Sequence, residues 1–323
     1  MSRHDAKQKQ KPRWPLLEAG YAPATVRKYR PAVLRFIDWC LRTGQDAQSI
    51  DDFDELLADY FQQIHDENDG AGKSIAVATL SGVRMYMPRL KDPSALPIAS
   101  AVCNRWSRSK PTVSYPPLTW ELAVAIACQM ARAGHYRFGV ATLVGFDCLL
   151  RKNELVSIRR EDFADGKDAR LGFDYQQAVV SIEKAKTGRF QSVEVERPAV
   201  RALLTDLANR TKPRQPLFPG GAQKYYDVFK QTCANLGLSD RYVPHSLRHG
   251  GATSMKLRGW SLEDIMQRGR WKSAMSARTY IDAGRAMLMA VKVPASIAAA
   301  GQALAHDVGL AMALTQKHKV KGG

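Results

Sequence analysis

Long hydrophobic runs are absent from this sequence of 323 residues. No stretch approaches the ~20 apolar residues of a membrane-spanning helix. The first residues, MSRHDAKQKQKPRWP, are basic and polar, with no hydrophobic segment behind them as a signal peptide would have. We therefore expect a soluble, intracellular protein without a membrane partner. It would lie in the cytoplasm or nucleoid of a prokaryotic or viral host, or in the nucleus of a eukaryotic one.

Cysteine is scarce and unpaired. The five thiols are odd in number, widely spaced and without a CxxC pair, which indicates free, buried cysteines of a reducing compartment. A zinc site needs Cys and His clustered at ligand spacing, and the nearest histidine pair, His245 and His249, has no third partner in the sequence. We expect no metal and no other cofactor.

Acidic residues are in deficit. Lys and Arg number 48 against 31 Asp and Glu, which gives a formal net charge of +17 and a pI near 9.8. Such an excess is typical of proteins that bind polyanions, above all nucleic acid. The 45% hydrophobic content is ordinary for a folded protein. We expect a folded nucleic-acid-binding protein.

The length favours two domains. Residues 1–16 predict a basic, disordered tail. Residues 17–107 carry four helical apolar patterns and predict a compact all-α domain, with Pro31 expected to kink the first helix. Residues 108–117 are rich in proline and predict an extended linker. The four helices are expected to begin near Pro23, Asp52, Lys73 and Ile98.

Residues 118–292 predict a second domain, which opens with two helices after the N-cap Thr119. The apolar period then changes to two, which predicts three short strands, and helices resume at Pro198 and at about Ala222. Residues 293–323 predict an alanine-rich helix and a basic tail. The fold class is therefore mainly α with a small antiparallel β-sheet (α+β). The strands are expected at Leu155–Phe163, Ala178–Lys184 and Gln191–Val195, and the last helix at Ala295–Thr315.

Candidate functional residues concentrate between Val243 and Asp282. The segment HSLRHGGATSM predicts a helix with His245, Arg248 and His249 on neighbouring faces. Its two glycines are costly in a helix, which indicates a close backbone approach.

A second helix, capped by Ser261, should end at Gly269. Trp271 would then lie just past the helix end, with its indole N–H available. A further helix from about Ser273 should carry Tyr280.

The order HxLRH, G-x-W and then Tyr nine residues after Trp resembles the tyrosine recombinase (phage integrase) family. Upstream, LLRKNELVSIRREDF is similar to the family's box around its first catalytic arginine. The segment EKAKTGRFQSVEV is similar to its β-hairpin with a catalytic lysine. Residues 17–107 resemble the family's core-binding (SAM-like) DNA-binding domain and residues 118–292 its catalytic domain. The resemblance covers nearly the whole chain from about residue 17.

The resemblance implies a catalytic set in which Arg151 and Arg248 bind the scissile phosphate and Tyr280 is the nucleophile. Glu154 would steady the arginines, and Lys186 would protonate the 5′-oxygen leaving group. His245 would transfer a proton or orient the phosphate. Trp271 stands where many members have a second histidine and some have tryptophan.

The chemistry of these side chains agrees with the assignments. A guanidinium can donate two hydrogen bonds to the charged oxygens of a phosphodiester under attack, which lysine cannot match. A phenol has a pKa of about 10, so Tyr280 needs a cationic surround or a base to react near neutral pH. Trp271 has no ionisable proton, which leaves proton transfer to His245 or to His249. The phosphotyrosyl bond keeps the energy of the broken ester, so no cofactor is required.

Simpler interpretations remain open for several of these residues. Glu154 could be a structural ion-pair partner, Trp271 could be core, and both histidines could be structural. Lys184 and Arg189 compete with Lys186 for the role of leaving-group acid. Candidates for contact with the DNA backbone are Lys73, Arg84, Arg108, Lys110, Arg189, Arg270 and Lys272.

The expected function is site-specific recombination of double-stranded DNA through a 3′-phosphotyrosyl intermediate. The protein would belong to a mobile genetic element. By the resemblance, four protomers would act on two sites, with the helix after Pro294 docking into a neighbour. Alternatives are a strand transferase like a type IB topoisomerase or telomere resolvase, and an inactive DNA-binding regulator on the same scaffold. The target sequence depends on a few base contacts that the sequence does not place.

Overall fold

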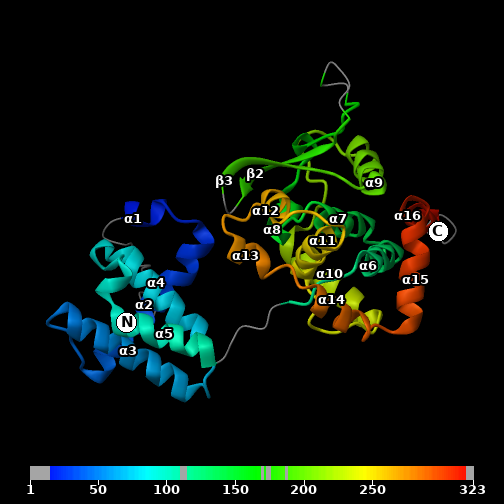
Figure 1. Cartoon of the computed structure of the whole chain (residues 1–323). Coiled ribbons are helices and arrows are strands. Elements are labelled where there is room, and N and C mark those ends of the chain that lie inside the picture. The colour runs from blue at the N-terminus through cyan, green and yellow to red at the C-terminus, as the bar shows by residue number, and fades with distance from the viewer. Residues whose placement is uncertain (1–14, 110–114, 169–170, 172–175, 186–187, 318–323) are drawn as a thin grey trace, which may run out of the picture. The chain divides into compact units, whose positions relative to one another are not determined.

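The computed structural model describes residues 15–109, 115–168, 171, 176–185 and 188–317. The chain divides into two compact units, Met1–Val113 and Ser114–Gly323 (Figure 1).

The first unit is helical. A buried cluster that includes Phe36, Trp39, Leu57 and Phe61 forms its core, and α2 packs on α4 while α3 packs on α5. The helix α2 continues across Pro31. The elements are α1 (Leu16–Ala19), α2 (Pro23–Thr43), α3 (Ile50–Glu67), α4 (Lys73–Tyr86), η1 (Pro88–Leu90), η2 (Pro93–Ala95) and α5 (Pro97–Ser109).

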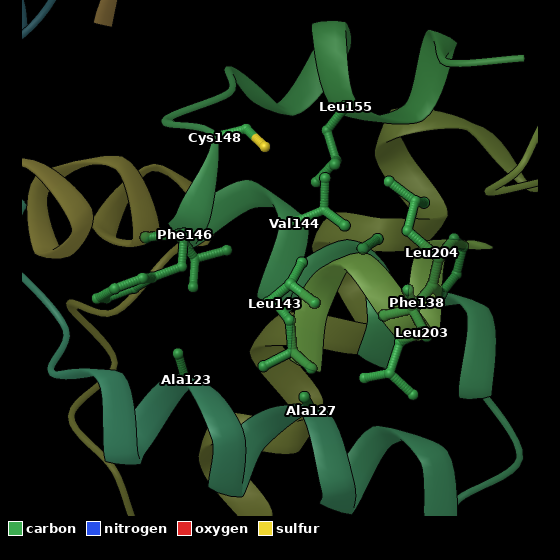
Figure 2. Packing of buried hydrophobic residues seen from close by; sticks show 14 of the residues in the cluster. Ala123, Ala127, Phe138, Leu143, Val144, Phe146, Cys148, Leu155, Leu203 and Leu204 are labelled. Atoms are coloured by element: carbon green, nitrogen blue, oxygen red, sulfur yellow. The ribbon is translucent and has the colours of Figure 1, made fainter. Parts of the chain in front are cut away.

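The second unit is built around α6 (Trp120–Arg132) and α7 (Tyr136–Asp147), which pack along each other. Thr119 caps α6 as expected, since its hydroxyl accepts the Leu122 N–H. Figure 2 shows Ala123 and Ala127 of α6 facing Leu143 of α7 in the shared core. The helices that pack on this pair are α8 (Lys152–Ser157), α9 (Pro198–Asn209), α10 (Gly221–Asn235), α11 (Pro244–Leu257), α15 (Ala295–His306) and α16 (Val308–Lys317). The helices α12 (Leu262–Gly269) and α14 (Ala283–Ala290) pack on α11, and α13 (Ala274–Arg278) packs on α12.

A three-stranded antiparallel sheet in the order β1-β2-β3 accompanies these helices. The strands are β1 (Phe163–Ala164), β2 (Val179–Ala185) and β3 (Gly188–Glu194). The register pairs Val179 with Glu194 and Ala185 with Gly188, so β2 and β3 form a hairpin. The expected fold class and the second and third predicted strands are confirmed.

The prediction of a strand over Leu155–Phe163 is wrong for most of its length. Residues up to Ser157 form α8, and β1 follows the short helix η3 (Arg160–Asp162). The cause is Glu154, whose carboxylate accepts the backbone N–H of Arg151 at 3.0 Å. This bond caps the first turn and favours helix over strand.

The C-terminal prediction of one helix is also wrong. Asp307 separates α15 from α16 because its carboxylate caps the second helix, accepting the Leu310 N–H at 2.9 Å. Both helices pack against α6 of their own chain, and α16 also contacts α7 and α9. Met312 is fully buried there, 3.9 Å from the thiol of Cys128.

Two further boundaries near Tyr280 differ from prediction. The helix α13 ends at Arg278, before Tyr280, and the unexpected α14 begins after Asp282, whose carboxylate accepts the Arg285 N–H at 2.8 Å. Across the described residues no single helix is long and apolar enough to cross a membrane. In the same described ranges, the pair Gly284–Ala290 and Ala295–His306 reaches that length and composition, but it is bent by 113°.

Candidate active site

Tyr280 lies in a turn after α13, and α11 holds it from the other side. Its N–H donates to Ala277 O at 2.9 Å, and its carbonyl accepts the Thr253 hydroxyl at 3.2 Å. The hydroxyl of Tyr280 lies 3.1 Å from Nε2 of His245. The predicted nucleophile and the predicted proton-transfer residue are therefore within hydrogen-bond distance.

Two further rings pack on the Tyr280 ring. His249 stacks on it with a centroid distance of 4.3 Å and an interplanar angle of 25°. Trp271 packs against it at 4.8 Å. The sequence named His249 only as an alternative for proton transfer, whereas the structure places it as a stacking partner of Tyr280.

Both histidines are held neutral. Burial, followed by the charges of Arg248 and Arg151, lowers the pKa of His245 to about 4. Burial, followed by His245 and nearby arginines, lowers the pKa of His249 to about 3. A neutral imidazole that carries its proton on Nδ1 has a free lone pair on Nε2. In this tautomer His245 accepts the hydrogen bond of the Tyr280 hydroxyl and can take its proton.

Arg248 is fully buried beside these rings. Its guanidinium carbon lies 4.3 Å from the Trp271 ring centroid and 5.5 Å from that of Tyr280. Its two Nη atoms donate to the carbonyls of Leu149 and Gly269, and within the part of the chain that the structure describes its buried Nε has no partner. Burial, with Arg151 and Arg270 nearby, lowers the pKa of Arg248, but arginine stays charged in proteins. Arg248 therefore places a positive charge beside the Tyr280 ring.

Glu154 joins two other arginines. Arg151 donates from Nη1 to Glu154 Oε1 at 2.6 Å, and Arg270 donates from Nη2 to Glu154 Oε2 at 2.9 Å. Burial alone would raise the pKa of Glu154, but the Arg151 N–H and the two arginine charges outweigh it and leave this pKa lowered. We expected Glu154 to steady Arg151 and Arg248; among the described contacts its arginine partners are Arg151 and Arg270.

Backbone conformation brings these groups together. Leu149 and Arg270 are two of the four described residues other than glycine with a positive φ, at 51° and 57°. A left-handed residue with a side chain costs about 1 to 2 kcal/mol, and such residues gather at functional sites. Leu149 turns its carbonyl toward both Arg248 and Arg270. The helix α12 ends at Gly269 as predicted, and Arg270 is its left-handed C-cap.

Trp271 belongs to the site and to the core. It packs in a buried cluster with Leu149, Met255 and Ile265, and a Cβ on Gly269 would meet its ring at 1.8 Å. Its indole Nε1 is nonetheless buried without a hydrogen-bond partner among the described residues. A buried N–H without a partner is costly and is usually satisfied by a ligand or water. Trp271 therefore offers a donor beside Tyr280 and Arg248.

The glycine pair of α11 has the close approach that the sequence predicted. A Cβ on Gly250 would lie 2.0 Å from Leu118 O, and one on Gly251 would lie 2.3 Å from Phe146 O. The helix that carries His245 and Arg248 is thereby packed directly on the backbone that precedes α6 and on α7.

The other predicted site residues either lie outside the described residues or have no described contact with Tyr280. Lys186 and Lys110 lie outside the described residues, as does the side chain of Arg189. Arg84 donates to the Ser100 hydroxyl at 2.7 Å. Lys73 is half-buried at the start of α4, and Arg108 and Lys272 are exposed.

Arg270 differs from its predicted role as a contact to the DNA backbone. Its side chain is only 5% exposed because it faces Glu154. The sequence offered one sign that Arg270 has a structural role. It has an arginine just before Trp271, at a helix end where glycine is more favourable. Across the described ranges, no group of three or more His, Cys, Asp or Glu side chains could hold a metal ion.

Comparison with known proteins gives one family and several related folds. The model of the phage integrase family matches residues 123–286. No curated protein sequence matches the chain.

Solved structures match over most of the chain. A lambda integrase dimer bound to a COC′ core site has 17% identity and a TM-score of 0.58, covering 84% of this chain and 92% of that one. A lambda integrase tetramer bound to a Holliday junction has 17% identity and a TM-score of 0.57, covering 83% and 74%. The Tn1549 transposon integrase in complex with circular intermediate DNA has 14% identity and a TM-score of 0.59, covering 83% and 92%. At these identities the likeness is one of fold.

Proposed function

Since the chain belongs to the phage integrase family of tyrosine recombinases, we propose that it is a site-specific DNA recombinase that works through a 3′-phosphotyrosyl intermediate. The observation that carries the proposal is the 3.1 Å approach of the Tyr280 hydroxyl to His245 Nε2. The neutral histidine can accept the proton of the Tyr280 hydroxyl, and Arg248 places a positive charge beside the Tyr280 ring.

The reaction follows from these groups. The Tyr280 oxygen attacks the scissile phosphorus as its proton passes to His245, and the bond from phosphorus to the 5′-oxygen breaks. The leaving oxygen takes a proton, for which Lys186 is the proposed source. Arg151, Arg248 and the Trp271 N–H stabilise the charge on the nonbridging oxygens. Attack by a 5′-hydroxyl on the phosphotyrosine reverses these steps and reseals the DNA.

Arg248 sets a condition on this reaction. Its side chain has no exposed surface, and the rings of Trp271 and Tyr280 lie beside its guanidinium. A phosphate can reach Arg248 only after side chains around it move. Arg151, whose side chain is 22% exposed, would be the first arginine to meet DNA. Hydrogen bonds in a free enzyme often tighten only when substrate is bound.

The proposal also covers the oligomeric state and the biological role of the chain. A lambda integrase tetramer has been solved on a Holliday junction, and a transposon integrase shares the fold. We propose a tetramer of this chain on two specific DNA sites and a role in a mobile element.

The test is covalent capture of DNA. A pool of nicked duplexes, randomised around the nick, would be incubated with the wild-type protein and with Tyr280→Phe. The wild-type protein should form an adduct at a 3′-phosphate, whereas Tyr280→Phe should form none. Adducts that persist in Tyr280→Phe would reject the nucleophile. Sequencing the captured duplexes would give the preferred target.

The outcome after cleavage needs a second assay. A supercoiled plasmid with two captured sites should give recombinant products. Relaxation of a plasmid with one site, without recombinants from two, would favour a function like that of a type IB topoisomerase.

A further inference from the structure

Arg270 stands in a backbone conformation that glycine would adopt more easily. Its φ is 57°, in the left-handed region, at the point where the chain leaves α12. A residue with a side chain persists there only when its surroundings compensate. An arginine at this position therefore indicates that its side chain has a role.

The Arg270 side chain is bonded inside the protein. Its Nη1 donates to Arg268 O at 3.2 Å, and its Nη2 donates to Glu154 Oε2 at 2.9 Å and to Leu149 O at 3.3 Å. Only 5% of the side chain is exposed, and its described hydrogen bonds all go to these partners. We therefore look for an effect of Arg270 that passes through them.

Glu154 is the partner that connects Arg270 to the phosphate site. If its carboxylate faced Arg151 alone, the pair would have no net charge, and the carboxylate would compete with a DNA phosphate for the guanidinium. With Arg270 on Oε2 and Arg151 on Oε1, the three groups carry a net charge of +1. Arg151 is the most exposed of the three side chains, so the surplus charge faces the solvent.

We propose that Arg270 is a positioning residue for DNA cleavage, which shares the Glu154 carboxylate so that Arg151 keeps its orientation and its charge for the scissile phosphate. The proposal rests on the proposed function, because it assumes that Arg151 binds that phosphate. It assigns Arg270 no contact with DNA.

The test measures the rate constant of adduct formation at saturating DNA, on a nicked duplex captured with the wild-type protein. Arg270→Met should lower this constant about 10- to 100-fold, the effect of removing an outer partner of a charged ligand in metal sites. The rate constant is the readout because an unfolded fraction lowers only the amount of adduct. Arg268→Met is the matched control. The Arg268 side chain is also little exposed, at 9%, but it pairs with Asp147 and Glu196 and not with Glu154, so the rate constant should stay at the wild-type value.

A second pair of variants tests the route through Glu154. If Arg270 acts only through that carboxylate, Glu154→Gln and Glu154→Gln with Arg270→Met should cleave at rates within about twofold of each other. This comparison also decides the matter if Arg270→Met alone does not fold.

Two results would overturn the inference alone: a wild-type rate constant for Arg270→Met, or a further tenfold loss when Arg270→Met is added to Glu154→Gln. Failure of the folded wild-type protein to form any adduct would instead reject the proposed function, and this inference with it.

Discussion

The histidines beside Tyr280 stay neutral at a pH at which the surrounding arginines stay charged. Burial is the main cause of the lowered pKa of His245 and His249, whereas a guanidinium keeps its proton even when buried. The residues around the tyrosine therefore divide the work. In the proposed reaction, a neutral base takes the proton and fixed positive charges hold the developing phosphate charge.

Neutral buried histidines also make the fold sensitive to acid. Because the pKa of His249 is about 3 in the folded protein and about 6.5 in an unfolded chain, the unfolded state binds more protons between these values. The free energy of unfolding therefore keeps its full value above pH 6.5 and decreases as the pH falls below 6.5. For His249, which is 5% exposed, the expected loss from pH 7 to pH 5 is about 2 kcal/mol.

Urea unfolding at pH 7 and pH 5 measures this loss. His249→Gln should lose less stability between the two pH values than the wild-type protein does. The exposed His306→Gln serves as the control and should lose as much as the wild type. An equal loss in His249→Gln and wild type would contradict the assignment.

At the scale of elements, α16 completes the core of the second unit. Met312 is fully buried against Cys128 of α6, and its side chain also lies beside Gly139 of α7. The sequence favoured docking of this segment into a neighbour. In this structure α15 and α16 pack on α6 of their own chain. Docking of this segment into a neighbouring protomer would therefore require that it first leave α6.

Shortening the Met312 side chain should therefore destabilise the fold. Met312→Ala should lower the free energy of unfolding by about 2 to 5 kcal/mol, since it removes buried atoms and leaves a cavity. Leu314→Ala, on the same helix but 49% exposed, should change it by less than about 1 kcal/mol. Thermal or urea unfolding of the full chain gives both values. Similar values for the two variants would mean that α16 does not pack on the core in solution.

At the scale of the whole molecule, the proposed function predicts that the net charge of +17 contributes strongly to DNA affinity. Bound Lys and Arg release counterions from the phosphate backbone, so affinity falls steeply as salt rises. The exposed Lys272 lies next to Trp271 and is a candidate for one such contact.

Binding of Tyr280→Phe protein to a captured duplex, measured across salt concentrations, tests this contact. Adding Lys272→Gln should reduce the slope of log affinity against log salt by about 0.9, the value for one phosphate. Arg258→Gln is the control, because Arg258 already pairs with Glu196 at 2.8 Å, and it should leave the slope unchanged. A slope that Lys272→Gln does not alter would remove Lys272 from the contact set.

The sequence by itself determined the family and the candidate nucleophile, because the spacing of His245, Arg248, Trp271 and Tyr280 is a local pattern of chemically distinctive side chains. Thr119 and Pro198 likewise marked helix starts, since capping depends on neighbouring residues.

Only the tertiary structure decided which groups these residues meet. Arg248 bonds to Leu149 across 99 positions of sequence, and Arg270 bonds to Glu154 across 116. Periodicity and caps describe contacts within a few residues, so they could not reveal that Glu154 joins Arg270 to Arg151. The same limit explains α16, whose place on α6 is decided by the packing of the buried Met312 and not by a pattern within the helix.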